Sequence, residues 1–203
     1  MSLDKVEYSL NGQTYILTKD SSTGKYKYAG TAPTKSSYSQ TDHKYPSVLK
    51  ATDKAGNVTT IDKNNTTFGS EMLIDVDEKV APVITRALPG AGAYLTSQSV
   101  QIQFNVTDND SGVNPSSISL QTDSNAAITT GLTKSQISGG YRCTYTATLA
   151  DGSHTIKINA KDNDGNAATQ KTVAFTVDTV PPTLNVPTPA DNLITNKQAG
   201  TVS

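Results

Sequence analysis

The chain is built from short segments in which apolar and polar residues alternate, the pattern of a strand with one buried face. Alternation is clearest in residues 154–162 and again in residues 172–178. Between these runs, residues 162–166 (DNDGN) predict a turn, because Asp and Asn side chains can bond their own backbone and Gly165 can adopt a positive φ. No window shows the helical period, so we expect an all-β fold without significant helix.

Alternation predicts further strands along the chain. Residues 6–10 and 13–17 flank Asn11-Gly12, a strong signal for a β-hairpin with a two-residue turn. That turn pairs Leu10 with Gln13, Tyr8 with Tyr15 and Val6 with Leu17, so we expect Tyr8 and Tyr15 to pair in the core. The other expected strands are 25–29, 45–53, 72–77, 82–86, 100–106, 118–120 and 141–149, with a possible short edge at 94–97.

The inward positions of the strands between residues 100 and 175 should form one core. Each is apolar and alternates with polar neighbours, as in a sandwich of antiparallel sheets. The predicted core residues are Val100, Ile102, Phe104, Val106, Ile118, Leu120, Tyr145, Ile156, Ile158, Val173 and Phe175.

An internal repeat sets the predicted domain organisation. Residues 51–60 (ATDKAGNVTT) match residues 160–169 (AKDNDGNAAT), which indicates a unit of about 100 residues, the length of a β-sandwich module. We therefore expect a first module at 4–79, a complete module at 80–180, and a linker with the opening strand of a third module at 181–203.

Aligning the two modules leaves the first one without its first two strands. Two ways of completing it stay open. The first module is a half-sandwich that is stable by itself, or residues 181–203 of another chain fill the gap.

Composition excludes several partners and chemistries. Lys and Arg number 17 against 18 Asp and Glu, which argues against nucleic acid or an anionic membrane as a partner. No segment approaches the ~20 apolar residues of a membrane-spanning helix, so we expect no membrane insertion. Cys143 is the sole cysteine and lies on an apolar strand face, so we expect a buried, unreactive thiol.

Three segments carry a resemblance to a known family: 104–120 (FNVTDNDSGVNPSSISL), 149–166 (LADGSHTIKINAKDNDGN) and 175–182 (FTVDTVPP). They resemble the bacterial immunoglobulin-like (Ig-like) modules, akin to fibronectin type III, that occur in tandem on surface proteins, secreted enzymes and phage virions. Residues 44–62 and the hairpin YSLNGQTYIL resemble Ig-like repeats of phage tail and surface proteins. The resemblance implies tandem antiparallel β-sandwich modules. The paired cysteines and the Trp of antibody domains are missing.

Two acidic loops are the strongest candidates for metal binding. Asp108 and Asp110 in DNDSG, and Asp162 and Asp164 in DNDG, offer oxygen ligands of the kind that Ca²⁺ prefers. Some tandem Ig-like modules hold calcium between carboxylates at their ends. Neither loop has EF-hand spacing, however, and both are typical of turns stabilised by Asp side chains. We therefore expect turns and no required metal or cofactor, and leave calcium open.

Other candidate residues have structural interpretations. His43 and His154 lack a convergent third group for a zinc site or a catalytic triad. The tyrosines crowd into the first module, but only Tyr38, within the polar loop 30–43, is expected to be exposed, and that loop is a candidate binding surface.

No residue set looks catalytic, so we do not expect an enzyme. The resemblance and the short Pro-bounded linkers at 77–82 and 178–182 predict a semi-rigid spacer or adhesive segment of an extracellular bacterial surface protein or phage structural protein. Its expected partners are neighbouring Ig-like modules and a surface glycan or protein. The alternative is a carbohydrate- or protein-binding accessory module of a secreted bacterial enzyme.

Overall fold

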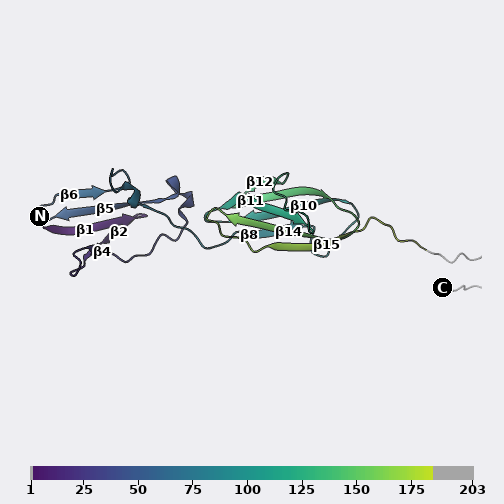
Figure 1. Ribbon diagram of the computed structural model, residues 1–203, viewed down its shortest axis with the longest axis horizontal. Helices are drawn as coiled ribbons and strands as arrows, with labels where there is room; N and C mark the ends of the chain where they lie inside the picture. Colours follow the sequence, from purple (N-terminus) through teal and green to yellow (C-terminus); the bar gives the residue numbers. More distant parts are fainter. Residues whose placement is uncertain (1, 185–203) are drawn as a thin grey trace, which may run out of the picture.

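The computed structural model describes residues 2–184 and is elongated, with two groups of strands following one another along its long axis (Figure 1). Strand pairing is antiparallel throughout the described part, apart from one parallel pair between β9 and β15. Helical structure there is confined to three short 3-10 turns: η1 (Ser37–Ser39), η2 (Thr41–His43) and η3 (Gly69–Met72). The predicted all-β class is confirmed.

The N-terminal unit, strands β1 to β7, is a single five-stranded sheet with a small ribbon beside it. The sheet has the order β2-β1-β5-β6, and β7 also pairs with β5. The ribbon pairs β3 with β4. The strands are β1 (Leu3–Leu10), β2 (Gln13–Ile16), β3 (Thr18–Lys19), β4 (Tyr26–Lys27), β5 (Tyr45–Asp53), β6 (Val58–Ile61) and β7 (Leu73–Ile74).

The first hairpin has the predicted register. Tyr8 lies opposite Tyr15, and Leu10 opposite Gln13. Beyond the end of β2, the amide of Leu17 still donates to the carbonyl of Val6 at 2.8 Å. Asn11 and Gly12 both have positive φ, 48° and 75°, which a type I′ turn requires.

Several predictions for the N-terminal unit need correction. Only Tyr26–Lys27 of the expected strand 25–29 pairs, and only Leu73–Ile74 of 72–77. Strand β6 was missed because three of its four side chains are exposed, so its sequence shows no one-faced pattern. Tyr8 and Tyr15 are half-buried rather than part of a core, since no second sheet covers their face within the described residues.

The sandwich, strands β8 to β15, consists of two four-stranded sheets. One has the order β12-β13-β10-β8 and the other β11-β14-β15-β9. The strands are β8 (Val83–Leu88), β9 (Tyr94–Leu95), β10 (Ser99–Thr107), β11 (Val113–Thr122), β12 (Thr133–Ile137), β13 (Gly140–Thr148), β14 (Gly152–Asp162) and β15 (Lys171–Val177).

The core of the sandwich contains the predicted residues. All of them are buried except Tyr145, which is half-buried and packs against the cluster. Strand β12 was not predicted, because its sequence, TKSQI, is mostly polar and no position in it is fully buried. The correspondence between residues 51–60 and 160–169 matches the end of β5 with the end of β14. Each of these strands pairs with an antiparallel neighbour in its own sheet, β5 with β1 and β14 with β11. The module boundaries at 79 and 180 stay a prediction, and most of segment 181–203 lies outside the described residues.

Truncating Phe104, a fully buried core residue, should destabilise the sandwich. Phe104 has no exposed surface. We expect Phe104→Ala to lower the free energy of unfolding by about 3–5 kcal/mol, because it removes buried apolar surface and leaves a cavity. Chemical denaturation followed by circular dichroism measures this. A loss below about 0.5 kcal/mol, typical of surface positions, would contradict the placement of Phe104 in the core.

Cys143 should be inert in the folded protein. Its side chain is fully buried, and burial raises the pKa of its thiol to about 11. Because the thiolate is the reactive form, we expect a thiol reagent at pH 8 to label the native chain far more slowly than the urea-unfolded chain. Labelling followed by mass spectrometry tests this, and equal rates in the two states would refute it.

Candidate functional site

The connection between the two units is held in place by one linker residue, Glu78. Its amide donates to Asp164 Oδ2 at 2.8 Å, and its carbonyl accepts from Asn166 Nδ2 at 3.1 Å. The residue is only 8% exposed, and its carboxylate accepts a hydrogen bond from the amide of Ser111 at 2.7 Å. All three polar groups of this residue therefore bind loops of the sandwich. We call this contact region, residues 75–82 with loops 108–112 and 162–166, the joint.

The loop at residues 30–43 also takes part in the joint. The amide of Ser36 donates to Asp110 Oδ1 at 3.0 Å, and Lys35 Nζ lies 3.9 Å from Asp110 Oδ2. Ser37 binds the linker in both directions, since its amide donates to the carbonyl of Val76 and its hydroxyl accepts from the amide of Val76. Ser36 and Ser37 are buried, so this part of the loop is packed against the joint and is not free to act as a binding surface.

Both acidic loops are turns stabilised by their first Asp, as the sequence predicts. Asp108 Oδ1 accepts from the amides of Asp110 and Gly112 at 3.0 and 2.8 Å. Asp162 accepts from the amide of Asn166 and from its side-chain amide, each at 2.7 Å. Asp110 and Asp164 bind backbone amides of the loop and linker instead, and so serve as docking acceptors.

The structure adds a carboxylate that the sequence interpretation missed. Glu78, Asp108 and Asp162 are all buried, and each has an oxygen within 4.8 Å of the other two. Glu78 was overlooked because it lies in a linker without periodicity, 30 positions from Asp108. The available signal was an acidic residue within a short Pro-bounded linker, next to the module end that carries both acidic loops.

The cluster brings three acidic groups together, and their charges affect one another. Burial raises the pKa of Glu78, and the nearby charges of Asp108 and Asp110 raise it further, against the lowering effect of Ser111. Among the ion pairs of residues 2–184, none involves the three clustered carboxylates, and Lys35 pairs only with the neighbouring Asp110. The donors are oxygens without His or Cys, so this cluster has the chemistry to hold a hard cation and not zinc.

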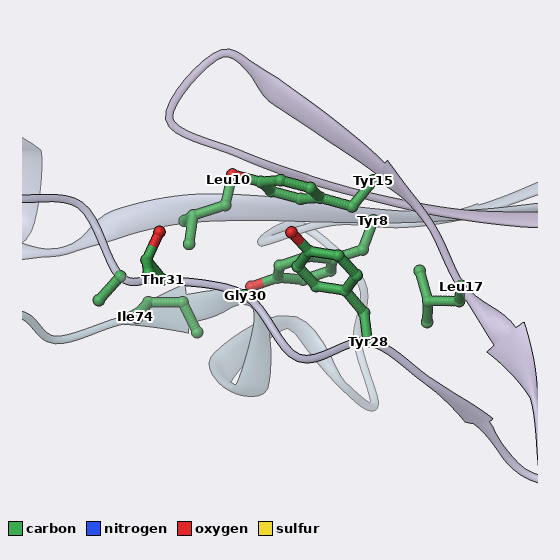
Figure 2. Close-up of a pocket in the computed structure, with 9 residues that line it drawn as sticks. Tyr8, Leu10, Tyr15, Leu17, Tyr28, Gly30, Thr31 and Ile74 are labelled. Carbon is green, nitrogen blue, oxygen red and sulfur yellow. The ribbon is translucent and has the colours of Figure 1, made fainter.

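A second candidate site is an apolar groove on the N-terminal sheet (Figure 2). It has a volume of about 390 Å³ and lies between the first hairpin, the segment after β4 and β7. The rings of Tyr15 and Tyr28 stack with centroids 4.4 Å apart and planes at 24°. The groove is lined by Tyr8, Leu10, Tyr15, Leu17, Tyr28, Gly30, Thr31, Ala32 and Ile74.

The expectation that Tyr38 alone would be exposed among the tyrosines of this unit is wrong. Tyr28 is 45% exposed and Tyr38 36%. Tyr28 follows a strand only two residues long, so no sheet continues over it. Tyr38 stacks on His43 with ring centroids 4.3 Å apart.

The two histidines do not assemble a catalytic site. His43 lies in η2 of the N-terminal unit and His154 in β14 of the sandwich. His154 Nδ1 lies 2.9 Å from Asp123 Oδ2, and its Nε2 lies 2.7 Å from the carbonyl of Ala150. Both partners accept hydrogen bonds, so the ring is best satisfied when doubly protonated, which raises the pKa of His154. These two contacts tie His154, near the start of β14, to Asp123 and Ala150.

These contacts of His154 predict a pH dependence of stability. A raised histidine pKa adds stability below the ordinary value of 6.5, and this stability is lost as the pH rises through the folded pKa. We expect His154→Gln to cost more unfolding free energy at pH 5.5 than at pH 8.5, because the wild-type ring loses its proton as the pH rises. Urea unfolding at the two pH values tests this. A cost independent of pH would show that the ion pair with Asp123 does not contribute.

No helix in the described part of the chain is long and apolar enough to cross a membrane.

Comparison with known proteins identifies the sandwich. Residues 95–179 match the family model described as a bacterial Ig-like domain, which covers less than half of the chain. No curated protein matches the sequence. The sandwich with its two antiparallel sheets therefore has an Ig-like fold, as the resemblance implied.

Three solved structures illustrate the likeness. CopC from Methylosinus trichosporium OB3b is 23% identical, with 48% of this chain and 93% of that chain covered and a TM-score of 0.38. The fibronectin(III)-like modules of Clostridium thermocellum CbhA are 18% identical, with 87% and 78% covered and a TM-score of 0.36. The sialic acid binding region of a Streptococcus sanguinis SK1 adhesin is 14% identical, with 64% and 35% covered and a TM-score of 0.35. Similarity at this level carries no argument about function.

Proposed function

We propose that the chain is a non-enzymatic structural or adhesive segment of an extracellular bacterial or phage protein, in which two Ig-like modules, 4–79 and 80–180, form a semi-rigid spacer. The observation that carries this proposal is the burial of Glu78 in the joint, with its amide, carbonyl and carboxylate all bound to the sandwich. A linker that serves only as a flexible tether would leave these groups to water.

The hydrogen bonds of the joint favour one orientation of the modules. Asp110 and Asp164 accept from backbone amides of Ser36 and Glu78, and the charge on these acceptors strengthens such bonds to about 1.5–3 kcal/mol each. The two contacts lie on different segments, a loop of the N-terminal unit and the linker itself. Two separate attachment points resist bending better than one, so the spacer holds its shape.

The overall shape suits a spacer. The described residues run from β1 at one end of the long axis to the segment after β15 at the other (Figure 1). A segment of this shape separates whatever precedes it from whatever follows it. Its partners would be neighbouring Ig-like modules and a surface glycan or protein, and its place the cell surface or a virion.

The apolar groove favours a second candidate function, a carbohydrate- or protein-binding accessory module of a secreted enzyme. Sugar-binding platforms present free aromatic faces to the ligand. Tyr15 and Tyr28 instead stack on each other, which occupies one face of each ring. We therefore place this function second to the spacer.

Distances between the units test the spacer. Spin labels attached through Ser70→Cys and Ser135→Cys, two exposed positions, report one distance between the modules, while buried Cys143 stays unlabelled. We expect a narrow distance distribution for the parent chain. Adding Asp110→Ala and Asp164→Ala should broaden it, because both docking acceptors are lost.

The matched control is Asp77→Ala, which removes an exposed carboxylate from the same linker. It should leave the distribution narrow. A parent chain as broad as the double variant would overturn the proposal of a rigid joint.

A further inference from the structure

The N-terminal sheet corresponds to one sheet of the sandwich. The internal repeat places Leu49 of β5 at the position of Ile158 in β14. Tyr8 lies opposite Leu49 and Leu120 lies opposite Ile158, so β1 corresponds to β11. Leu120 and Ile158 have no exposed surface, whereas Tyr8 and Leu49 are only half-buried. The apolar face of the N-terminal sheet is thus the counterpart of a face that the sandwich covers completely.

The ribbon of the N-terminal unit is the counterpart of the hairpin β12-β13, since each lies in chain order between the two matched strands. In the sandwich, β13 pairs with β12 on one side and with β10 on the other. In the N-terminal unit, β4 pairs with β3 alone, and residues 28–34 after it pair with no strand of the described residues. The unit therefore has no described strand at the position that β10 holds in the sandwich.

The apolar groove lies at this position. It is bounded by Tyr8 and Leu10 of β1, by the segment 28–32 and by Ile74 of β7 (Figure 2). Ile74 occupies the same place in its sheet as Phe175, a core residue of β15, by the pairing of β7 with β5 and of β15 with β14. The groove is thus bordered by counterparts of core residues and by the edge to which β10 would pair.

The shape and charge of the groove suit an extended, apolar chain. A second hollow of about 330 Å³ shares Leu10 and Tyr15 with the groove and continues it to the hairpin turn at Asn11. Together the two hollows follow the hairpin lengthwise. Neither is lined by a charged side chain of the described residues, so the groove offers a ligand no ion pair.

Strand β10 shows which kind of chain covers such a face. Val100, Ile102 and Phe104 are buried in the core cluster that also contains Leu120. The side chains between them are polar, and those at alternate positions of a strand point to opposite faces. The matching occupant is therefore a strand with a large apolar side chain at every second position.

We propose that the groove accepts one β-strand of a partner polypeptide with this alternating pattern. Its backbone would pair with the edge at residues 28–32, and its apolar side chains would cover Tyr8, Leu10 and Ile74. Strand addition to a free edge is a general mode of peptide recognition, in which main-chain hydrogen bonds give affinity and alternate side chains give specificity. This role goes beyond the spacer, and it gives the groove of the second candidate function a peptide ligand.

The C-terminal segment of a second copy fits this description poorly. Residues 181–195 repeat the segment that precedes β10, so residues 196–203 are the sequence counterpart of its first half. They carry Ala199, Thr201 and Ser203 at the three inward positions. These side chains are too small and polar to fill an apolar groove of about 390 Å³, which favours a separate partner. Residues 185–203 themselves lie outside the described part of the chain.

A synthetic peptide with the sequence of residues 98–108 (QSVQIQFNVTD), which contains most of β10, tests the acceptor. Added to the isotope-labelled full chain, it should shift the amide signals of residues 6–17 and 28–34 and leave those of the sandwich unchanged. Ile102→Asp and Phe104→Asp, made in the peptide alone, should weaken binding at least about tenfold, because a charge is costly to bury in an uncharged groove. These changes leave the protein itself unaltered.

A groove variant provides the reciprocal test. Leu10→Asp in the full chain should weaken binding of the unchanged peptide at least about tenfold for the same reason. The matched control is Ile16→Asp. Ile16 is 68% exposed and follows the groove residue Tyr15 in β2, so its side chain points to the opposite face of the sheet. This control should bind the peptide like the parent chain.

Several outcomes would overturn the strand acceptor. One is no binding at about 1 mM peptide, where any complex with a Kd below that value would be at least half formed. Others are shifts confined to the sandwich and equal binding of the Asp-substituted peptide. A neutral oligosaccharide such as maltohexaose that shifts the groove signals when the peptide does not would assign the groove to a sugar.

The oligomeric state distinguishes the remaining occupant. A dimer seen by light scattering that blocks peptide binding and disappears on deletion of residues 185–203 would assign the groove to a second copy and contradict the proposal. A monomeric chain that binds the peptide supports it. The spin-label distances decide separately whether the joint is rigid, so the spacer and the strand acceptor can fail independently.

Discussion

Each of the three larger sheets of the described residues has one apolar face, and the need to cover that face governs the architecture. In the sandwich, the two sheets cover one another, and Phe104, Ile118 and Ile156 lose all contact with solvent. In the N-terminal unit, no second sheet packs on the five-stranded sheet within the described residues, and Tyr28, from the segment after the ribbon, stacks on Tyr15 instead. The same alternating pattern therefore gives a closed core in one place and a groove lined by tyrosines in the other.

The joint shows how acidic side chains can serve two purposes at once. Asp108 and Asp162 hold their own turns through backbone amides, which fixes the loops at the end of the sandwich. Fixed loops can then present Asp110 and Asp164 to the loop and linker of the preceding unit. The contact between the N-terminal unit and the sandwich thus depends on local turns, and the turns depend on the spacing of Asp, Asn and Gly in each loop.

What the sequence could predict follows from the range of each interaction. Strands with a buried face, such as β10 and β14, show their pattern over a few neighbouring residues, and the Asn11-Gly12 turn sets the hairpin register locally. Strands β6 and β12 pair through their backbones with largely exposed side chains, so they leave no pattern to find. Asp108 and Asp162 were candidates because their loops are recognisable, whereas Glu78 reaches them only through the folded linker.

The parallel pairing of β9 with β15 has a mechanical consequence. The amides of Thr176 and Asp178 donate to the carbonyls of Ala93 and Leu95, each at 2.8 Å. The chain enters the sandwich just before β9, through β8, and leaves it directly after β15. Once β8 has separated from β10, tension along the chain would draw β9 and β15 past each other in opposite directions. Their hydrogen bonds would then share the load and would have to break together rather than open one at a time.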